Sequence, residues 1–440
     1  MRADRTQSGR NDHPGRRRFA VILLLIASLA EPFVETLTTD RSHYVEGAVE
    51  TPRPLIETIT ALSSAVIPAV AFAVLLVVLL WSKVNGAALV LVAVPSLTMA
   101  AIEFAHGRAV GPSLFLPAIA GALLVTLRVK TTDLILLGYA GALVAVISLL
   151  GFVFEPAMVL MSAGLTHADK SITGVPLLAG IFSHSNILGL FLSASLPFVF
   201  LERRFWLRWL MVAVIAVALV LSSARTALLG AGVVLAAVAV GWVLPRLAFR
   251  VVTAVGLLVM AVLLVQVPFS ERDPSAYTYR GEIWMYNIDQ LSGHYLTGLG
   301  AWYYSDNYGA LKAALSSAAS HAHNAALTML VMGGVVLIGA AVLVIWFAWR
   351  GVRRVAVRRE MIVGAAFLLG MLAMSITETT VRFAGWGPLS ASVLIPVFVY
   401  VSHAVSPPVA AGSVLDATEG RPAAPLTRRA SRASAAVGAH

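Results

Sequence analysis

The chain has 440 residues, of which 59% are hydrophobic and only 12% are charged. A water-soluble domain averages about 45–50% apolar and about 25% charged residues. The composition therefore excludes a single soluble core and predicts an all-α polytopic membrane protein. The absence of cysteine excludes disulfides, iron–sulfur clusters and thiol catalysis.

Polar segments flank the predicted membrane domain. Residues 1–18 are polar and end in three arginines, which predicts a disordered cytoplasmic lead rather than a cleavable signal peptide. Residues 405–440 are rich in Ala, Pro, Ser and Arg, which predicts a disordered cytoplasmic tail. Residues 19–404 are expected to form one transmembrane domain.

Twelve apolar segments follow one another in this domain, most of them close to the ~20 residues that a bilayer crossing needs. In the first segment Glu31 and Pro32 interrupt the apolar run, so its outer half is expected to be irregular or to face protein. The predicted spans are Phe19–Leu37, Ile56–Trp81, Gly86–Ala105, Gly111–Leu127, Leu134–Phe154, Ile181–Leu201, Trp206–Ser222, Thr226–Leu244, Val251–Pro268, Ala325–Trp349, Met361–Thr377 and Trp386–Ala404.

The basic residues predict the orientation of these spans. With the N-terminus in the cytoplasm, 23 of the 32 lysines and arginines lie in cytoplasmic segments, as expected for short loops on the inner side of a membrane. Both termini are therefore predicted to be cytoplasmic. The net charge of +10 is explained by topology, and no nucleic-acid partner is expected.

One long polar segment, residues 270–323, separates the ninth span from the tenth and is predicted to be extracytoplasmic. It contains arginines, histidines, acidic residues and many aromatic residues. We predict that the helices form a frame and that this loop, together with a few residues from helix ends, carries the chemistry.

Two arginines on the predicted outer side are candidate anion-binding residues. Arg225 lies in the short connection between spans seven and eight, where an arginine is costly unless it is paired or faces water. It either snorkels to the surface or binds an anion beside Ser222 and Ser223. Arg280 begins an amphipathic segment, where free backbone N–H groups also favour an anion. An ordinary salt bridge with Glu282 or another neighbour is the alternative for Arg280.

His321, His323 and Asn324 lie directly before span ten. A His-x-His pair can begin a metal site, but no further ligand is evident nearby, so no metal is expected. A neutral histidine at the membrane surface suits a general base near neutral pH, and Asn324 is a candidate for orienting it or for binding substrate. The alternative is that both histidines are only interfacial and satisfied by hydrogen bonds.

Four other residues are weaker candidates for substrate binding. Asn186 opens span six, where a helix N-cap is the simpler explanation. Trp284 belongs to the amphipathic segment after Arg280. Glu378 and Arg382 flank the outer end of span eleven, and pairing with each other is an alternative role for them.

These residues occur in an order that resembles the O-antigen ligase and O-antigen polymerase superfamily. The similarity lies in Gly180-x-Phe182-x-His184-x-Asn186-x-Leu188, Ser222-Ser223-x-Arg225-Thr226, Arg280-x-x-x-Trp284, Gly298-x-Gly300, His321-x-His323-Asn324 with Gly333-Gly334, and Thr377-Glu378. It covers roughly residues 180–378, and the first five spans match only in hydropathy. Ser185 stands where members often have Pro, and an Arg often found before this motif is absent, with Lys170 the nearest basic residue. These departures concern recognition of the donor sugar more than the core chemistry.

The resemblance implies an outward-facing glycosyltransferase of the bacterial plasma membrane that uses neither a metal nor a nucleotide sugar. Its donor would be an oligosaccharide on a polyprenyl diphosphate, and its acceptor a glycan or a lipid-linked glycan. By position in the motifs, Arg225 and Arg280 would bind the diphosphate, and His323 would activate the acceptor hydroxyl. No cofactor is implied.

Two other classes of function are alternatives to this enzyme. A transporter of a small anion or of a lipid-linked glycan predicts inverted repeats and charged, broken helices at the membrane midplane. No clear internal repeat is present, and the polar outliers gather at the outer surface. A non-catalytic scaffold gives no reason for Arg225, Arg280 and His323 together. The residues do not separate a polymerase from a ligase.

Overall fold

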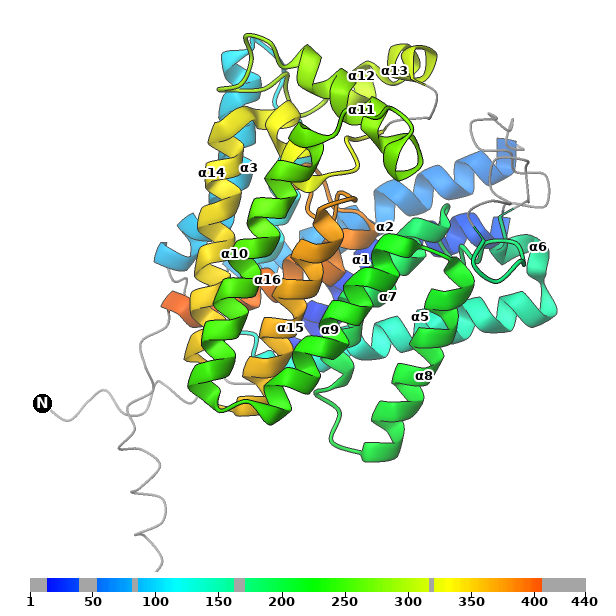
Figure 1. Ribbon diagram of the computed structural model, residues 1–440, viewed down its shortest axis with the longest axis vertical. Coiled ribbons are helices and arrows are strands. Elements are labelled where there is room, and N and C mark those ends of the chain that lie inside the picture. The colour runs from blue at the N-terminus through cyan, green and yellow to red at the C-terminus, as the bar shows by residue number, and fades with distance from the viewer. Residues whose placement is uncertain (1–13, 39–53, 81–85, 162–170, 316–319, 406–440) are drawn as a thin grey trace, which may run out of the picture. The chain divides into compact units, whose positions relative to one another are not determined.

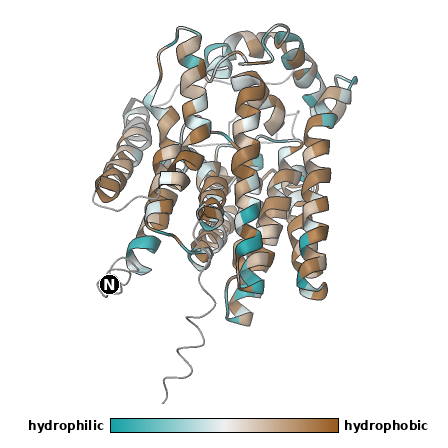
Figure 2. Cartoon of the chain, turned by 90° about the vertical axis from the view of Figure 1, so that its left-hand side faces the viewer, coloured by the Kyte–Doolittle hydropathy of each residue, from teal (hydrophilic) through white to brown (hydrophobic). Residues whose placement is uncertain are grey.

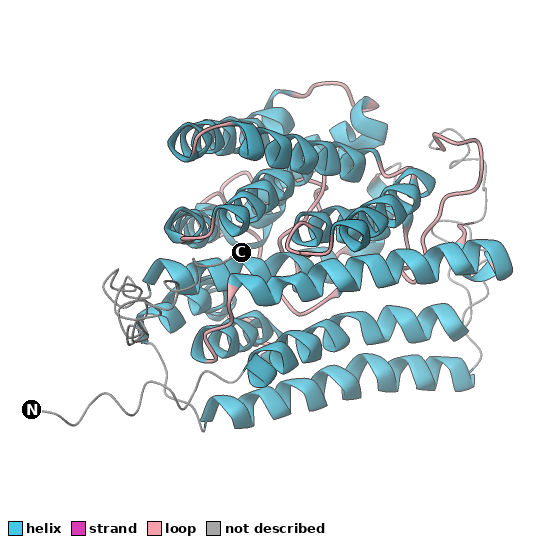
Figure 3. Ribbon diagram, turned by 90° about the horizontal axis from the view of Figure 1, so that it is seen from below, coloured by secondary structure: helices cyan, strands magenta, loops and turns pink. Residues whose placement is uncertain are grey.

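A computed structural model describes residues 14–38, 54–80, 86–161, 171–315 and 320–405 of the protein. Most of the predicted lead and nearly all of the predicted tail lie outside the described residues. The described residues are mainly helical and contain no β-strand (Figure 3). The predicted all-α fold of a polytopic membrane protein is confirmed.

Each of the twelve predicted spans falls on a helix. These helices are α1 (Pro14–Thr38), α2 (Pro54–Leu80), α3 (Gly86–Ala105), α4 (Leu116–Thr126), α5 (Ile135–Phe154), α7 (Ser185–Val199), α8 (Phe205–Ser222), α9 (Arg225–Val243), α10 (Arg246–Ser270), α14 (Ala325–Arg354), α15 (Arg358–Ser375) and α16 (Pro388–Val405). Short helices η1 (Pro112–Phe115), η2 (Thr131–Leu134) and α6 (Pro156–Val159) lie between them.

Length and hydropathy qualify eight of the described helices as membrane spans. Apolar residues run along the lengths of the helices while polar residues gather at their ends (Figure 2). The remaining four of the twelve, namely α2, α4, α7 and α15, do not meet both criteria over their described residues, so the count of twelve spans stays a prediction. The irregular alternative for the first span is wrong, because α1 continues as a helix through Pro32.

The helices differ greatly in burial. Helices α7, α15 and α16 are buried along most of their lengths, and α15 packs against α9 while α16 packs against α14. In contrast, only 11% of the apolar window of α10 is buried, as expected of a helix that faces lipid. The protein therefore has an internal group of helices whose ends are held by protein contacts.

The polar segment between α10 and α14 folds into α11 (Ala276–Gln290), α12 (Tyr303–Asp306) and α13 (Tyr308–Ala314). These helices lie together beyond one end of α10 and α14 (Figure 1). Helix α14 is broken at Gly334, whose φ is +63°. The polar segment is attached to α14 at this break. Hydrogen bonds join the segment to the helix there. The amide of Leu299 donates to the carbonyl of Val331 over 2.6 Å, and the amide of Val335 donates to the carbonyl of Tyr295 over 2.9 Å.

Close packing of α14 on α16 generates a test of this arrangement. A Cβ atom on Gly351 would meet the carbonyl oxygen of Tyr400 at 1.8 Å, whereas one on Gly339 in the same helix meets nothing within 4 Å. We expect Gly351→Ala to destabilise the protein by about 1–3 kcal/mol through overpacking. Gly339→Ala should be neutral or stabilising. Thermal unfolding in detergent checks both, and equal melting temperatures for the two variants would contradict the packing.

Candidate active site

A cavity of about 900 Å³ opens among the ends of α7 and α9, helix α11, and the segments before α14 and after α15. All but two of the residues singled out in the sequence line it. The candidates that line the cavity are Asn186, Arg225, Arg280, His321, His323, Glu378 and Arg382. Asn324 and Trp284 are the two that are not among its lining residues.

The two candidate anion-binding arginines each stand where a helix begins. Arg225 is the first residue of α9 and follows Ser223, whose φ of +51° turns the chain sharply out of α8. Tyr277, Thr278 and Tyr279 have left-handed backbone angles, so regular helix in α11 begins only at Arg280. Both side chains therefore line the cavity at the start of a helix.

Arg280 forms its ion pair with Glu378 after α15, across 98 residues of sequence, and not with the neighbouring Glu282 that the sequence offered as an alternative. Its Nη1 also donates to Thr226 Oγ1 over 3.3 Å, and Thr226 contacts Thr377 through hydroxyl oxygens 2.8 Å apart. Sequence reasoning missed this role of the two threonines. Their positions next to Arg225 and Glu378 were the available signal.

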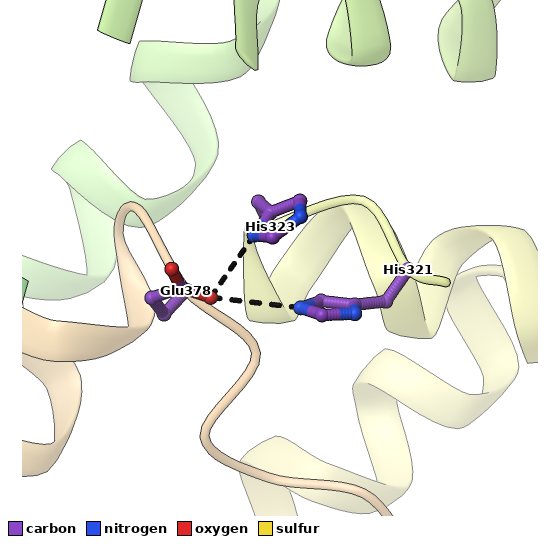
Figure 4. Close-up of side chains that lie close together, drawn as sticks. All are labelled: His321, His323 and Glu378. Atoms are coloured by element: carbon purple, nitrogen blue, oxygen red, sulfur yellow. Dashed lines mark hydrogen bonds and ion pairs between the residues drawn. The ribbon is translucent and has the colours of Figure 1, made fainter. Parts of the chain in front are cut away.

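Glu378 lies at the centre of the site, with a side chain only 4% exposed. Its Oε2 is 3.0 Å from His323 Nδ1 and 3.5 Å from His321 Nε2 (Figure 4). Its Oε1 accepts from Asn186 Nδ2 over 3.1 Å and from Arg280. The sequence offered pairing with Arg382 as an alternative role for Glu378. In the structure Glu378 instead contacts these four residues.

The charge state of this cluster follows from its surroundings. Burial by itself raises the pKa of the Glu378 carboxyl, but the nearby His323 and Arg280 and hydrogen bonds from both histidines hold this pKa well below its usual range. Burial, together with the nearby His323 and Arg382, lowers the pKa of His321 to about 3. At neutral pH the cluster therefore contains a carboxylate beside a neutral His321.

The hydrogen bond to Glu378 determines which nitrogen of His323 is available for chemistry. An ionised carboxylate only accepts hydrogen bonds, so His323 Nδ1 must carry the proton that bridges the two groups. In neutral His323 the other nitrogen, Nε2, then has a free lone pair. This is the arrangement required of a general base that is oriented by a carboxylate.

His323 is held in a strained backbone conformation, with a φ of +48°. The residue before it is fixed by a hydrogen bond of 2.8 Å from Trp284 Nε1 to the Ala322 carbonyl. The residue after it, Asn324, caps α14 by accepting from the amide of Leu327 over 2.8 Å. Strain of this kind persists only where the surroundings enforce it, and it is frequent at functional sites.

Asn324 and Trp284 are thus fully buried supports of the site. The Asn324 amide also donates to the carbonyls of Leu264 and Ile376 over 2.9 and 2.8 Å. The predicted substrate-binding role of these two residues is not supported by their positions. Their contacts instead position His323, which is one of the alternatives raised for Asn324.

Asn186 and Arg382 remain at the cavity. His184, not Asn186, caps α7, because its Nδ1 accepts from the amide of Asn186 over 3.0 Å. The N-cap explanation for Asn186 is therefore wrong, and its side chain is bound to Glu378 instead. Arg382 has an exposed side chain and lies within electrostatic reach of Glu378.

The fold brings a third potential metal ligand to the two histidines. The sequence offered His321 and His323 without a further ligand, whereas the structure adds Glu378 after α15. The three candidate ligand atoms lie within 4.8 Å of one another. These residues have the chemistry to hold a metal ion.

Residues 210–342 match a family model described as O-Antigen ligase. Over these residues the chain is similar to the O-antigen ligase family. The match runs from within α8 to within α14 and includes Arg225, Arg280, His321 and His323. It confirms the predicted resemblance to the O-antigen ligase and polymerase superfamily. No match to the chain was found among curated proteins.

At family level this match supports an O-antigen ligase-like membrane glycosyltransferase. Together with the apolar helices, it supports a multi-pass protein of the bacterial inner membrane that acts on lipid-linked glycans. Less than half of the chain is matched, and Asn186 and Glu378 lie outside the matched residues.

The buried neutral state of His321 predicts how stability depends on pH. In the unfolded chain a histidine binds a proton below its ordinary pKa of 6.5, whereas folded His321 binds one only near pH 3. Folding stability should therefore fall as the pH decreases below 6.5, before Glu378, whose ordinary pKa is 4.5, contributes. His321→Asn should weaken this dependence between about pH 6.5 and 5. Thermal unfolding across this range measures it, and an unchanged slope would contradict the assignment.

Proposed function

We propose that the protein transfers a glycan from a polyprenyl diphosphate to an acceptor hydroxyl of a glycan or lipid-linked glycan. We further propose that the site faces away from the cytoplasm, on the side predicted from the basic residues. The observation that carries the proposal is the hydrogen bond between His323 and Glu378 in a cavity that Arg225 and Arg280 also line. A base and two permanent cations are the groups this reaction needs.

The arginines would act on the donor. As the bond between the anomeric carbon and the phosphate oxygen breaks, the departing polyprenyl diphosphate gains negative charge. Guanidinium groups remain protonated and bind phosphate oxygens through two parallel hydrogen bonds. In a cavity partly closed to water such groups stabilise developing charge by several kcal/mol. Arg225 and Arg280 would supply this stabilisation without a metal.

His323 would act on the acceptor. Its Nε2 accepts the proton of the hydroxyl as the oxygen attacks the anomeric carbon, and Glu378 stabilises the imidazolium that forms. The new bond between oxygen and carbon replaces the bond to phosphate in one displacement, which inverts the anomeric configuration. Glu378 is the carboxylate of the cluster, and its hydrogen bonds to Arg280, Asn186 and His323 argue against its acting as a covalent nucleophile.

The direct test supplies purified protein with a polyprenyl-diphosphate oligosaccharide and EDTA, and follows glycan length and release of polyprenyl diphosphate. Arg280→Ala should lower the rate about 10²–10³-fold through loss of charge stabilisation. His323→Ala should lower it about 10²–10⁴-fold through loss of the base. Arg272→Ala, at an exposed position of the same segment, is the matched control and should retain full activity.

The outcomes of this assay separate the alternatives. Longer glycans from donor alone indicate a polymerase, and release of polyprenyl diphosphate only with an added acceptor indicates a ligase. A trapped glycosyl–protein intermediate would refute inversion by single displacement. Equal rates for wild type, Arg280→Ala and His323→Ala would refute the assignment of the site.

The role of Glu378 has its own test. Glu378→Gln keeps the shape of the side chain but removes the charge that orients His323 and stabilises its imidazolium. We expect a loss of about 10²-fold or more in kcat, with a smaller change in KM. The pH–rate profile should also shift, because the base loses its carboxylate partner. An unchanged pH–rate profile, together with a loss of kcat that thermal unfolding traces to poor folding, would mean that Glu378 has only a structural role.

A further inference from the structure

The side chains that meet at Glu378 have the geometry of a metal site. Glu378 Oε2 lies 3.0 Å from His323 Nδ1 and 3.5 Å from His321 Nε2. Zn²⁺ binds such nitrogen and oxygen atoms at about 2.0–2.2 Å in a tetrahedral arrangement, which sets neighbouring ligand atoms roughly 3.3 Å apart. Both separations lie within a few tenths of an ångström of that spacing. The third, between the two nitrogens, is at most 4.8 Å.

Outer contacts already orient two of these three ligands. Glu378 uses Oε1 for Asn186 and Arg280, which leaves Oε2 directed at the histidines. His321 Nδ1 contacts Ser320 Oγ over 2.9 Å, which leaves its Nε2 directed at Glu378. Partners of this kind fix the rotation and tautomer of metal ligands in known sites. The cluster would therefore need little rearrangement to bind an ion.

The ligand set selects the class of ion. Two imidazole nitrogens and one carboxylate oxygen suit Zn²⁺, Co²⁺, Ni²⁺ or Cu²⁺, whereas Mg²⁺ and Ca²⁺ prefer sites composed of oxygen atoms. Arg280 and Arg382 line the same cavity and oppose any cation through their charge. Binding must then depend on coordination bonds to nitrogen, which favours the transition metals further.

We propose that His321, His323 and Glu378 bind one first-row transition-metal ion such as Zn²⁺, and that the bound ion inhibits glycan transfer. The ion would occupy His323 Nδ1 in place of its proton, so the proton of the neutral ring would reside on Nε2. Nε2 could then no longer accept the proton of the acceptor hydroxyl. The inhibition rests on the proposed function, whereas the binding of the ion does not.

Binding is tested with Co²⁺, whose visible absorption reports on its ligands, added to full-length protein purified without a polyhistidine tag. We expect one Co²⁺ per chain, displaced by Zn²⁺ and unaffected by excess Mg²⁺. His321→Ala and Glu378→Gln should each weaken binding at least about tenfold. His294→Ala, at an exposed position of the same segment, should bind as wild type does. Melting temperatures establish that each variant is folded.

The outcomes separate the two parts of the proposal. Failure of wild type to bind Co²⁺, or equal binding by folded His321→Ala and Glu378→Gln, would overturn the site. In the transfer assay, Zn²⁺ should inhibit wild type over the concentration range in which it displaces Co²⁺, and EDTA should restore the rate. Binding without inhibition would overturn the regulatory part. Absence of transfer by metal-free wild type would overturn the proposed function, while the Co²⁺ titration would still decide the site.

Discussion

The candidate site depends on one buried carboxylate. Glu378 contacts Asn186 from α7, Arg280 from α11 and the two histidines that precede α14. Removing a charge from water costs several kcal/mol unless partners and hydrogen bonds compensate for it. Because the compensating groups come from separate helices, the ionised form of Glu378 favours the arrangement that brings the base and the arginine to one cavity.

Hydrogen bonds of two buried side chains hold the backbone on either side of His323. Trp284 fixes the carbonyl before His323, and Asn324 fixes the chain after it. The left-handed conformation of His323 is thereby maintained between two anchored neighbours. The break at Gly334 lies further along α14 and joins the polar segment between α10 and α14 to the same helix. The polar segment is thus attached to the membrane domain on both sides of the base.

The sequence predicted the parts of this structure that depend on local pattern. Apolar runs located the twelve helices, and the isolated His-x-His and arginine positions identified histidine and arginine side chains that line the cavity. The contacts of Glu378 were beyond such reasoning, since its partner Asn186 lies 192 residues away. For the same reason the sequence does not decide whether Asn324 orients His323 or binds substrate, and it makes Trp284 a candidate for substrate binding. Local sequence does not distinguish a polar side chain that forms a buried hydrogen bond from one that faces a cavity.

The contacts of Asn324 also bear on how the protein ages. Its side chain accepts one hydrogen bond through its oxygen and donates two through its nitrogen, to the carbonyls of Leu264 and Ile376. Spontaneous deamidation would replace the donating nitrogen with a second oxygen. An ionised carboxylate would then face two carbonyl oxygens in a buried position, with no proton to share. One hydrolysed amide would loosen α10 at Leu264 and the end of α15 together, directly beside His323.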